Sequence, residues 1–333
     1  MKKSLALAII GIIFIFILYT VAELIIPLPY GNKPVEFEVK KGQTLREVVT
    51  SLYKAGMIRD KTIFLILGRL TGLDRKVMAG YYTFWGNMTP LQILDALRKG
   101  KIIEYEITIV PGDSLDRISE KFSILGIIGK DEFERLSKDK NILQRLDIDA
   151  PSIEGYLFPD TYRFPKGLGA VEVIQMMVEH MRDKFDEDML ARAYEIGMSE
   201  NEVLTLASII EKEAIVDEER PIISAVYHNR LKKNMPLQAD PTSIYGIKGS
   251  GEPITKRDLL RKTPYNTYVI KGLPPGPIAS PGLKSIMAAL YPENVPYLYF
   301  VSNNDGTHTF SVSLEDHSRA VKVYRDKKKG ITG

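Results

Sequence analysis

The sequence has no cysteine and little histidine. Without cysteine, the 333 residues can form no disulfide, thiolate metal site or iron–sulfur cluster, and they supply no cysteine nucleophile. The four histidines are scattered, which leaves little material for a zinc site. We therefore expect a protein with no metal and no cofactor.

An excess of one charge is also lacking. The 45 Lys and Arg residues against 42 Asp and Glu leave a net charge of +3, too small to indicate a nucleic-acid partner. Hydrophobic residues make up 44% of the chain, enough to bury a core, which excludes wholesale disorder. Only one stretch is apolar for long enough to cross a membrane, which excludes a polytopic membrane protein.

That single apolar stretch runs from Ser4 to Ala22 and follows Lys2 and Lys3. About 20 apolar residues span the hydrocarbon core of a bilayer. The run is longer than the apolar part of a signal peptide, and no small-residue cleavage site closes it. The lysines before it place the N-terminus in the cytoplasm. We expect a single-pass anchor in the cytoplasmic (inner) membrane within residues 1–28, and an extracytoplasmic or periplasmic remainder; a cleaved signal peptide is the alternative.

Two segments share a strand, a G-[QD]-[TS]-L turn and an amphipathic helix, at residues 35–58 and 105–122. The pattern resembles the LysM module, a small β-α-α-β unit that often binds peptidoglycan glycan. The alternative is a strand–turn–helix without a ligand. We expect a LysM-like region over residues 29–125, a helical connector over 126–150 and a larger domain over 151–333.

A helix that opens with a Ser199 and Glu202 capping box presents a candidate acid at its far end. At 100° per residue, one face of this helix is apolar. Its members are Val203, Leu206, Ala207, Ile210 and Ala214. Glu213 lies about 60° from the centre of that face, where a carboxyl loses hydration and its pKa rises, as a general acid near neutral pH requires. The alternative is an ordinary helical glutamate paired with Arg or Lys.

The other carboxylates in and after this helix, Glu211, Glu218 and Glu219, look more solvated, and Lys212 points nearly away from the apolar face.

Downstream segments combine aromatic rings with short amides and hydroxyls, which is how proteins hold sugars: rings cover the apolar faces and polar groups bind the hydroxyls. Such segments lie at 237–246, 263–268 and 297–310. Turn and capping duty is the alternative role for their polar residues. The candidate substrate-binding residues are Gln238, Asp240, Tyr245, Asn266, Thr267, Tyr268 and His308.

Six motifs follow one another over about 170 residues. They are EGYLFPDTY, LASIIEKEA, LQADPTSIYG, TPYNTY, GLPPGPIASPG and PYLYFVSNNDGTHTF. Together they resemble the endolytic transglycosylase family MltG, also called YceG-like. The resemblance implies an α+β protein with an N-terminal transmembrane helix, LysM-like modules and a larger mixed α/β catalytic domain. It implies a lyase that cleaves nascent peptidoglycan between N-acetylmuramic acid and N-acetylglucosamine, leaving 1,6-anhydro-muramic ends.

In that family the catalytic residue is the second glutamate of the E-K-E motif, which is Glu213 here and would serve as general acid and then as base. The resemblance also implies association with penicillin-binding synthases and with elongation and division proteins. Two other interpretations stay open. One is a peptidoglycan hydrolase with Asp240 or Glu218 as a second carboxylate; the other is a non-catalytic wall-binding scaffold. An aminodeoxychorismate lyase is rejected, because it would need a pyridoxal phosphate site and the cytosol.

Overall fold

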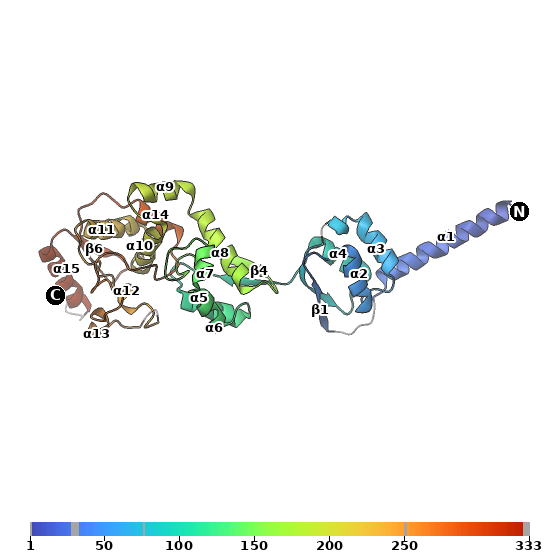
Figure 1. Cartoon of the computed structure of the whole chain (residues 1–333), viewed down its shortest axis with the longest axis horizontal. Coiled ribbons are helices and arrows are strands. Elements are labelled where there is room, and N and C mark those ends of the chain that lie inside the picture. Colours follow the sequence, from blue (N-terminus) through green and yellow to red (C-terminus); the bar gives the residue numbers. More distant parts are fainter. Residues whose placement is uncertain (1, 28–32, 76, 250–251, 329–333) are drawn as a thin grey trace. The chain divides into compact units, whose positions relative to one another are not determined.

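The computed structural model describes residues 2–27, 33–75, 77–249 and 252–328 (Figure 1). The predicted boundary at residues 28 and 29, and the predicted end of the last domain at 333, lie outside this part. Contacts divide the chain into two compact units. The first unit comprises Met1–Tyr105 with Arg163–Leu168, and the second comprises Glu106–Tyr162 with Gly169–Gly333. The chain passes between them along a pair of strands.

The N-terminal helix α1 covers Lys2–Ile25. Its residues 7–25 have a mean hydropathy of 2.6 and are long and apolar enough to cross a membrane, a property that an N-terminal signal sequence shares. The two residues after the helix are held by Arg59, whose guanidinium donates to the carbonyl oxygens of Ile26 (2.9 Å) and Pro27 (3.0 Å).

The first unit has the order β1, α2, α3, β2, α4, with a short 3₁₀ turn before β2. The bounds are β1 Pro34–Val39, α2 Leu45–Lys54, α3 Lys61–Leu70, η1 Leu73–Arg75, β2 Gly80–Trp85 and α4 Pro90–Lys99. The expected strand and helix after residue 35 are confirmed, and a Thr44–Glu47 capping box opens α2. β1 and β2 pair antiparallel with Phe37 opposite Tyr82. The inward side chains of both strands and of α2 and α4 form one apolar core.

The second unit is mainly helical. The boundaries between the two units fall within β3 Glu104–Thr108 and β4 Thr161–Pro165. The first helices of the second unit are α5 Leu115–Leu125, α6 Lys130–Leu136, α7 Lys140–Arg145 and α8 Ala170–Lys184. β3 pairs with β4, so α5, α6 and α7 lie between two paired strands in sequence. The second segment with the LysM-like pattern therefore starts in β3 and places its helix in the second unit. The predicted domain boundaries stay a prediction.

The remainder of the second unit surrounds one helix. Its elements are α9 Glu187–Glu195, α10 Glu200–Glu213, η2 Asp217–Glu219, α11 Arg220–Lys232, α12 Asp240–Ile244, α13 Lys256–Leu259, α14 Leu283–Leu290, β5 Tyr299–Ser302, β6 His308–Ser311 and α15 Leu314–Lys328. All eight residues 203–210 of α10 are buried, and α10 contacts α9, α11, α12 and α14. The expectation of a single buried face is wrong here, because neighbours enclose this helix all round.

The loop at 272–282 packs on α10. Its prolines exclude a helix or a central strand for this segment. The Ile278 N–H donates to the Ser208 hydroxyl at 3.0 Å, and the Gly282 N–H donates to the Glu211 carboxylate at 2.9 Å. β5 and β6 form an antiparallel hairpin that contacts α15. The described chain is thus a mixed α/β protein with an apolar N-terminal helix.

Candidate active site

Three consecutive side chains at the end of α10 reach three different places. Glu211 turns inward, contrary to expectation: its side chain is 8% exposed and lies 3.2 Å from the Arg220 guanidinium. Lys212 does point elsewhere, and its ammonium donates to the Gly112 carbonyl at 3.3 Å. Glu213, the last residue of the helix, borders a cleft. The side chains on either side of Glu213 in the sequence are therefore held by partners outside the cleft, and only Glu213 of the three lines it.

The carboxyl of Glu213 holds its proton unusually tightly. Burial, and after it the nearby negative charge of Asp240, raise its pKa from the ordinary 4.5 to about 8. The Asp240 N–H and the Tyr227 hydroxyl act in the opposite direction by stabilising the carboxylate. The net effect leaves Glu213 protonated at neutral pH, as the sequence predicts. A protonated carboxyl beside a cleft can donate a proton to a bound substrate.

The cleft has a volume of about 440 Å³ and is formed by residues of the second unit alone. Its lining residues are Glu213, Arg230, Leu237, Gln238, Asp240, Tyr268, Phe300, Val301, Ser302, His308, His317, Val321, Tyr324 and Arg325. Five of the eight residues singled out from the sequence are among them. The cleft is therefore built by the end of α10, the 237–240 segment, Tyr268, the β5–β6 hairpin and α15.

The 237–240 segment carries two of the candidate residues. Gln238 has a left-handed backbone (φ 49°), and its N–H donates to the Thr267 carbonyl at 3.1 Å. Asp240 is the first residue of α12, and its carboxylate accepts a hydrogen bond from the Tyr268 hydroxyl at 2.5 Å. Burial raises the pKa of Tyr268, and the hydrogen bond to Asp240 and the charge of Asp240 raise it as well. Tyr268 and Asp240 therefore form one hydrogen-bonded pair on the cleft wall.

Two predicted residues, Asn266 and Thr267, do not line the cleft but brace its wall. Both are fully buried. The Thr267 hydroxyl accepts from the Ala239 N–H at 2.9 Å and contacts the Thr242 hydroxyl at 2.8 Å. The Asn266 amide donates to three carbonyls, and its oxygen accepts from the Tyr268 N–H at 3.1 Å. These bonds fix Tyr268 and the 237–240 segment relative to each other.

Tyr245 also lies away from this cleft. Its hydroxyl donates to the carboxylate of Glu154 at 2.9 Å, and its ring packs on Tyr265. Glu154 is buried, accepts from the Leu115 N–H at the start of α5, and has a pKa raised by burial to about 7. The structure brings Tyr245 to a second buried carboxyl, in the EGYLFPDTY motif. Its role in substrate binding stays a prediction.

His308 reaches the cleft from β6. Its Nδ1 lies 2.6 Å from the Glu219 carboxylate, and its backbone N–H donates to the same carboxylate at 3.0 Å. The Glu219 side chain is 14% exposed, so the expectation of a solvated Glu219 is wrong, whereas Glu218 is exposed and outside the cleft. The two contacts with Glu219 therefore fix the position of the His308 imidazole.

Arg230 was missed by the sequence analysis. It is 7% exposed and donates to the carbonyl oxygens of Leu298 (2.7 Å) and Leu237 (2.8 Å), which joins α11 to β5 and to the cleft loop. Its guanidinium also lies 5.2 Å from the centre of the Tyr299 ring. Tyr227, one turn earlier on α11, is buried against the acid. The available signal was an arginine one turn after a tyrosine, a spacing that places both side chains on one face of α11.

The chain is similar to known proteins over most of its length. The family model of the YceG-like family matches residues 37–323. A Bacillus subtilis protein named endolytic murein transglycosylase is 31% identical over 88% of this chain and 86% of its own length. A protein of the same name from Streptococcus pneumoniae is 28% identical over 92% of this chain, but the match spans 62% of its length. A crystal structure of a YceG-like protein from Listeria monocytogenes is 30% identical, with a TM-score of 0.60 over 87% of this chain and 99% of that one.

Proposed function

The chain belongs to the YceG-like family, and on this premise we propose that it is an endolytic murein transglycosylase. The substrate would be the glycan strand of nascent peptidoglycan, and the bond cleaved would join N-acetylmuramic acid to N-acetylglucosamine. One observation carries the proposal: Glu213 presents a carboxyl that is protonated at neutral pH to a cleft of polar and aromatic side chains. Relatives with the printed name endolytic murein transglycosylase support it.

A single carboxyl suffices for this reaction. Glu213 donates its proton to the glycosidic oxygen as the C–O bond breaks, and positive charge develops on the muramic acid ring. The resulting carboxylate takes the proton of the C6 hydroxyl, which closes onto C1 and gives the 1,6-anhydro ring. The nucleophile is part of the substrate, so no positioned water is consumed. Glu213 ends the cycle protonated, as it began.

The neighbouring groups have separate tasks in this proposal. Asp240 keeps the proton on Glu213 before substrate binds, because two adjacent carboxylates resist ionising together. The same negative charge favours the developing oxocarbenium ion. Tyr268 holds Asp240 in place through its hydroxyl. Gln238 and His308 line the cleft, where an amide and an imidazole can bind sugar hydroxyls.

A hydrolase is the second candidate, and one contact favours it. Asp240 lies in the same cleft as Glu213 and is close enough to raise its pKa, so it could serve as the second carboxylate that hydrolysis requires. Glu218 lacks this support because it lies outside the cleft. The two reactions differ in product, since a hydrolase leaves reducing ends and a lyase leaves anhydro ends.

We further propose that α1 anchors the protein in the cytoplasmic membrane with the N-terminus inside, and that both LysM-like segments belong to wall-binding modules. The β1–α2–α3–β2 order with antiparallel outer strands supports the first module. The second would be β3 to β4, with three helices between the paired strands. The catalytic domain would then work beside the membrane, where penicillin-binding synthases and the elongation and division proteins extend new strands.

Mass spectrometry of the products tests the proposal. The full chain in detergent micelles is incubated with uncrosslinked peptidoglycan, as wild type, Glu213→Gln and Glu195→Gln. Glu195 is an exposed carboxylate at the end of α9 and serves as the matched control. We expect anhydro-muramic products from wild type and the control, and none from Glu213→Gln. Reducing ends would instead support the hydrolase, and a folded wild type without any product would leave a wall-binding scaffold.

A further inference from the structure

A second cavity lies in the first unit and shares no lining residue with the cleft at Glu213. It has a volume of about 810 Å³, within the range of small-molecule sites. Its lining residues are Thr71, Thr83, Trp85, Asn87, Met88, Leu91, Gln92, Leu94, Asp95, Ala96, Arg98 and Lys101. Most of them belong to the end of β2, the following turn and α4. The cavity therefore lies mainly along α4, which is not one of the four elements of the β1–α2–α3–β2 order. We name this cavity the α4 groove.

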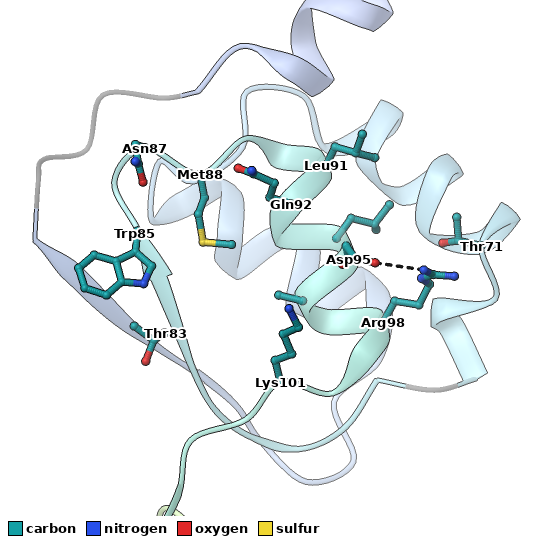
Figure 2. Close-up of a pocket in the computed structure, with 12 residues that line it drawn as sticks. Thr71, Thr83, Trp85, Asn87, Met88, Leu91, Gln92, Asp95, Arg98 and Lys101 are labelled. Carbon is teal, nitrogen blue, oxygen red and sulfur yellow. Dashed lines mark hydrogen bonds and ion pairs between the residues drawn. The ribbon is translucent and has the colours of Figure 1, made fainter.

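An exposed aromatic ring forms one side of the α4 groove. Trp85 is the only tryptophan of the chain, and it is 53% exposed at the last position of β2. Figure 2 shows Met88 and Lys101 pointing into the space between the indole and α4. A half-exposed indole beside a thioether presents a flat apolar surface of the kind on which the C–H face of a sugar ring packs.

Amide groups face the same space. The oxygen of Gln92 is occupied, because it accepts from the Thr89 N–H at 2.8 Å in the capping box of α4. The NH₂ end of the amide is therefore the end left to donate into the groove, which suits an acetamido or hydroxyl oxygen. Asn87 supplies a second amide on the turn beside Trp85. Fixed donors next to a flat apolar face are a recognition surface for amino sugars.

The charge of the groove is positive. Asp95 is already paired, with Arg98 at 3.0 Å and with Lys99 at 2.7 Å. Lys101, just after α4, makes no ion pair with any residue that the structure describes, and its side chain points into the groove. The lining holds one acid, Asp95, against two cations, Arg98 and Lys101, and this excess of positive charge attracts carboxylates.

We propose that the α4 groove binds a carboxylate-bearing amino-sugar strand, with a sugar ring on Trp85, an acetamido group at Gln92 and a carboxylate at Lys101. Murein strands combine all three features, because muramic acid carries stem peptides with free carboxylates. The choice of murein over another acidic glycan rests on the proposed function. The groove would hold the strand at a place separate from the cleft that cuts it.

The single tryptophan makes the proposal directly measurable. The full chain in detergent micelles carries Glu213→Gln in every sample, so that the probe is not cleaved. The probe is uncrosslinked murein strands with their stem peptides. We expect a saturable change of tryptophan emission, with an apparent affinity roughly five- to tenfold weaker in Lys101→Gln or Gln92→Ala. No saturable change, or unaltered affinity in both variants, would overturn the proposal.

A pelleting assay on insoluble peptidoglycan removes the dependence on fluorescence. Trp85→Ala is compared with Tyr53→Ala, which deletes a 45% exposed ring on α2 outside the groove. We expect about fivefold less pelleting for Trp85→Ala only. Equal pelleting would contradict the groove. An emission change with free stem peptide alone, as large as with strands, would show a peptide site instead of a glycan site.

The outcome is separable from that of the proposed function. Cleavage of the same strands is measured with wild-type Glu213, by mass spectrometry. Cleavage without an emission response overturns the groove and leaves the enzyme standing. An emission response without cleavage overturns the enzyme and leaves the groove.

Discussion

Replacing Glu213 with glutamine should make the second unit more stable at neutral pH. The pKa of this carboxyl is about 8 in the folded chain and ordinarily 4.5, so the folded state binds the proton more tightly than the unfolded state. As pH rises from about 4.5 to about 8, the unfolded chain ionises and the folded chain does not, so the free energy of unfolding falls. Glutamine imitates the protonated carboxyl and never ionises, so the variant escapes this loss.

The size follows from the shift. At pH 7 the wild type is about 2.5 pH units above the ordinary pKa, which at 1.36 kcal/mol per unit costs about 3 kcal/mol. For a unit of roughly 200 residues this corresponds to a rise in Tm of about 6–12 °C in Glu213→Gln. At pH 4.5 the difference should nearly vanish.

Thermal unfolding of the full chain in detergent at pH 4.5, 6, 7 and 8 measures the difference. Circular dichroism follows the helices of both units, whereas tryptophan emission follows the first unit alone, because Trp85 is the only tryptophan and lies there. A transition seen by circular dichroism and not by emission therefore belongs to the second unit. The emission transition should be the same in both proteins and serves as an internal reference. A Glu213→Gln protein whose Tm advantage does not grow between pH 4.5 and 7 would refute a buried, protonated Glu213.

Three further outcomes are expected. Activity should fall as pH rises through about 8, when Glu213 loses its proton. Asp240→Asn removes a charge that raises the pKa of Glu213, so this variant should show the fall at lower pH. The pH profile of kcat/KM measures both effects. Thr267→Val should cost about 1–3 kcal/mol in unfolding free energy, since it strips a buried N–H of its acceptor beside the cleft, and Thr267→Ser should restore most of it. Gly155→Ala should lower the Tm of the second unit, because a φ of +82° disfavours a side chain and the new Cβ would lie 2.5 Å from Pro277. Gly197→Ala has a similarly strained φ but open space around it, so it should lower the Tm less.

Features set by short-range chemistry were predictable from the sequence. The capping box at Ser199 is confirmed because it involves two residues three positions apart, and the box at Thr44 has the same spacing. Glu213 was predicted as the acid from its angular position on α10, which depends only on helix geometry, and its raised pKa agrees with the predicted loss of hydration. Its catalytic role stays a prediction. Gln238, Asp240, Tyr268 and His308 were found through their residue types, and the structure brings them to the same cleft.

Features set by distant partners were not predictable. Glu211 is buried because Arg220 and the N–H of Gly282, 71 residues away, reach it. Glu219 is largely shielded from solvent because His308, 89 residues away, pairs with it. A helical wheel describes one helix in isolation, whereas these burials depend on which loops return to it. The bracing roles of Asn266 and Thr267 were hidden for the same reason.

The position of Glu213 as the last residue of α10 has an energetic consequence of its own. The final carbonyls of a helix lack partners and carry partial negative charge, which disfavours a carboxylate at that end by about 0.3–1 kcal/mol. This repulsion comes from the main chain, so no side-chain substitution removes it. The proton on Glu213 is therefore retained by the direction of the helix as well as by its neighbours, and a variant that keeps α10 intact keeps part of the rise in its pKa.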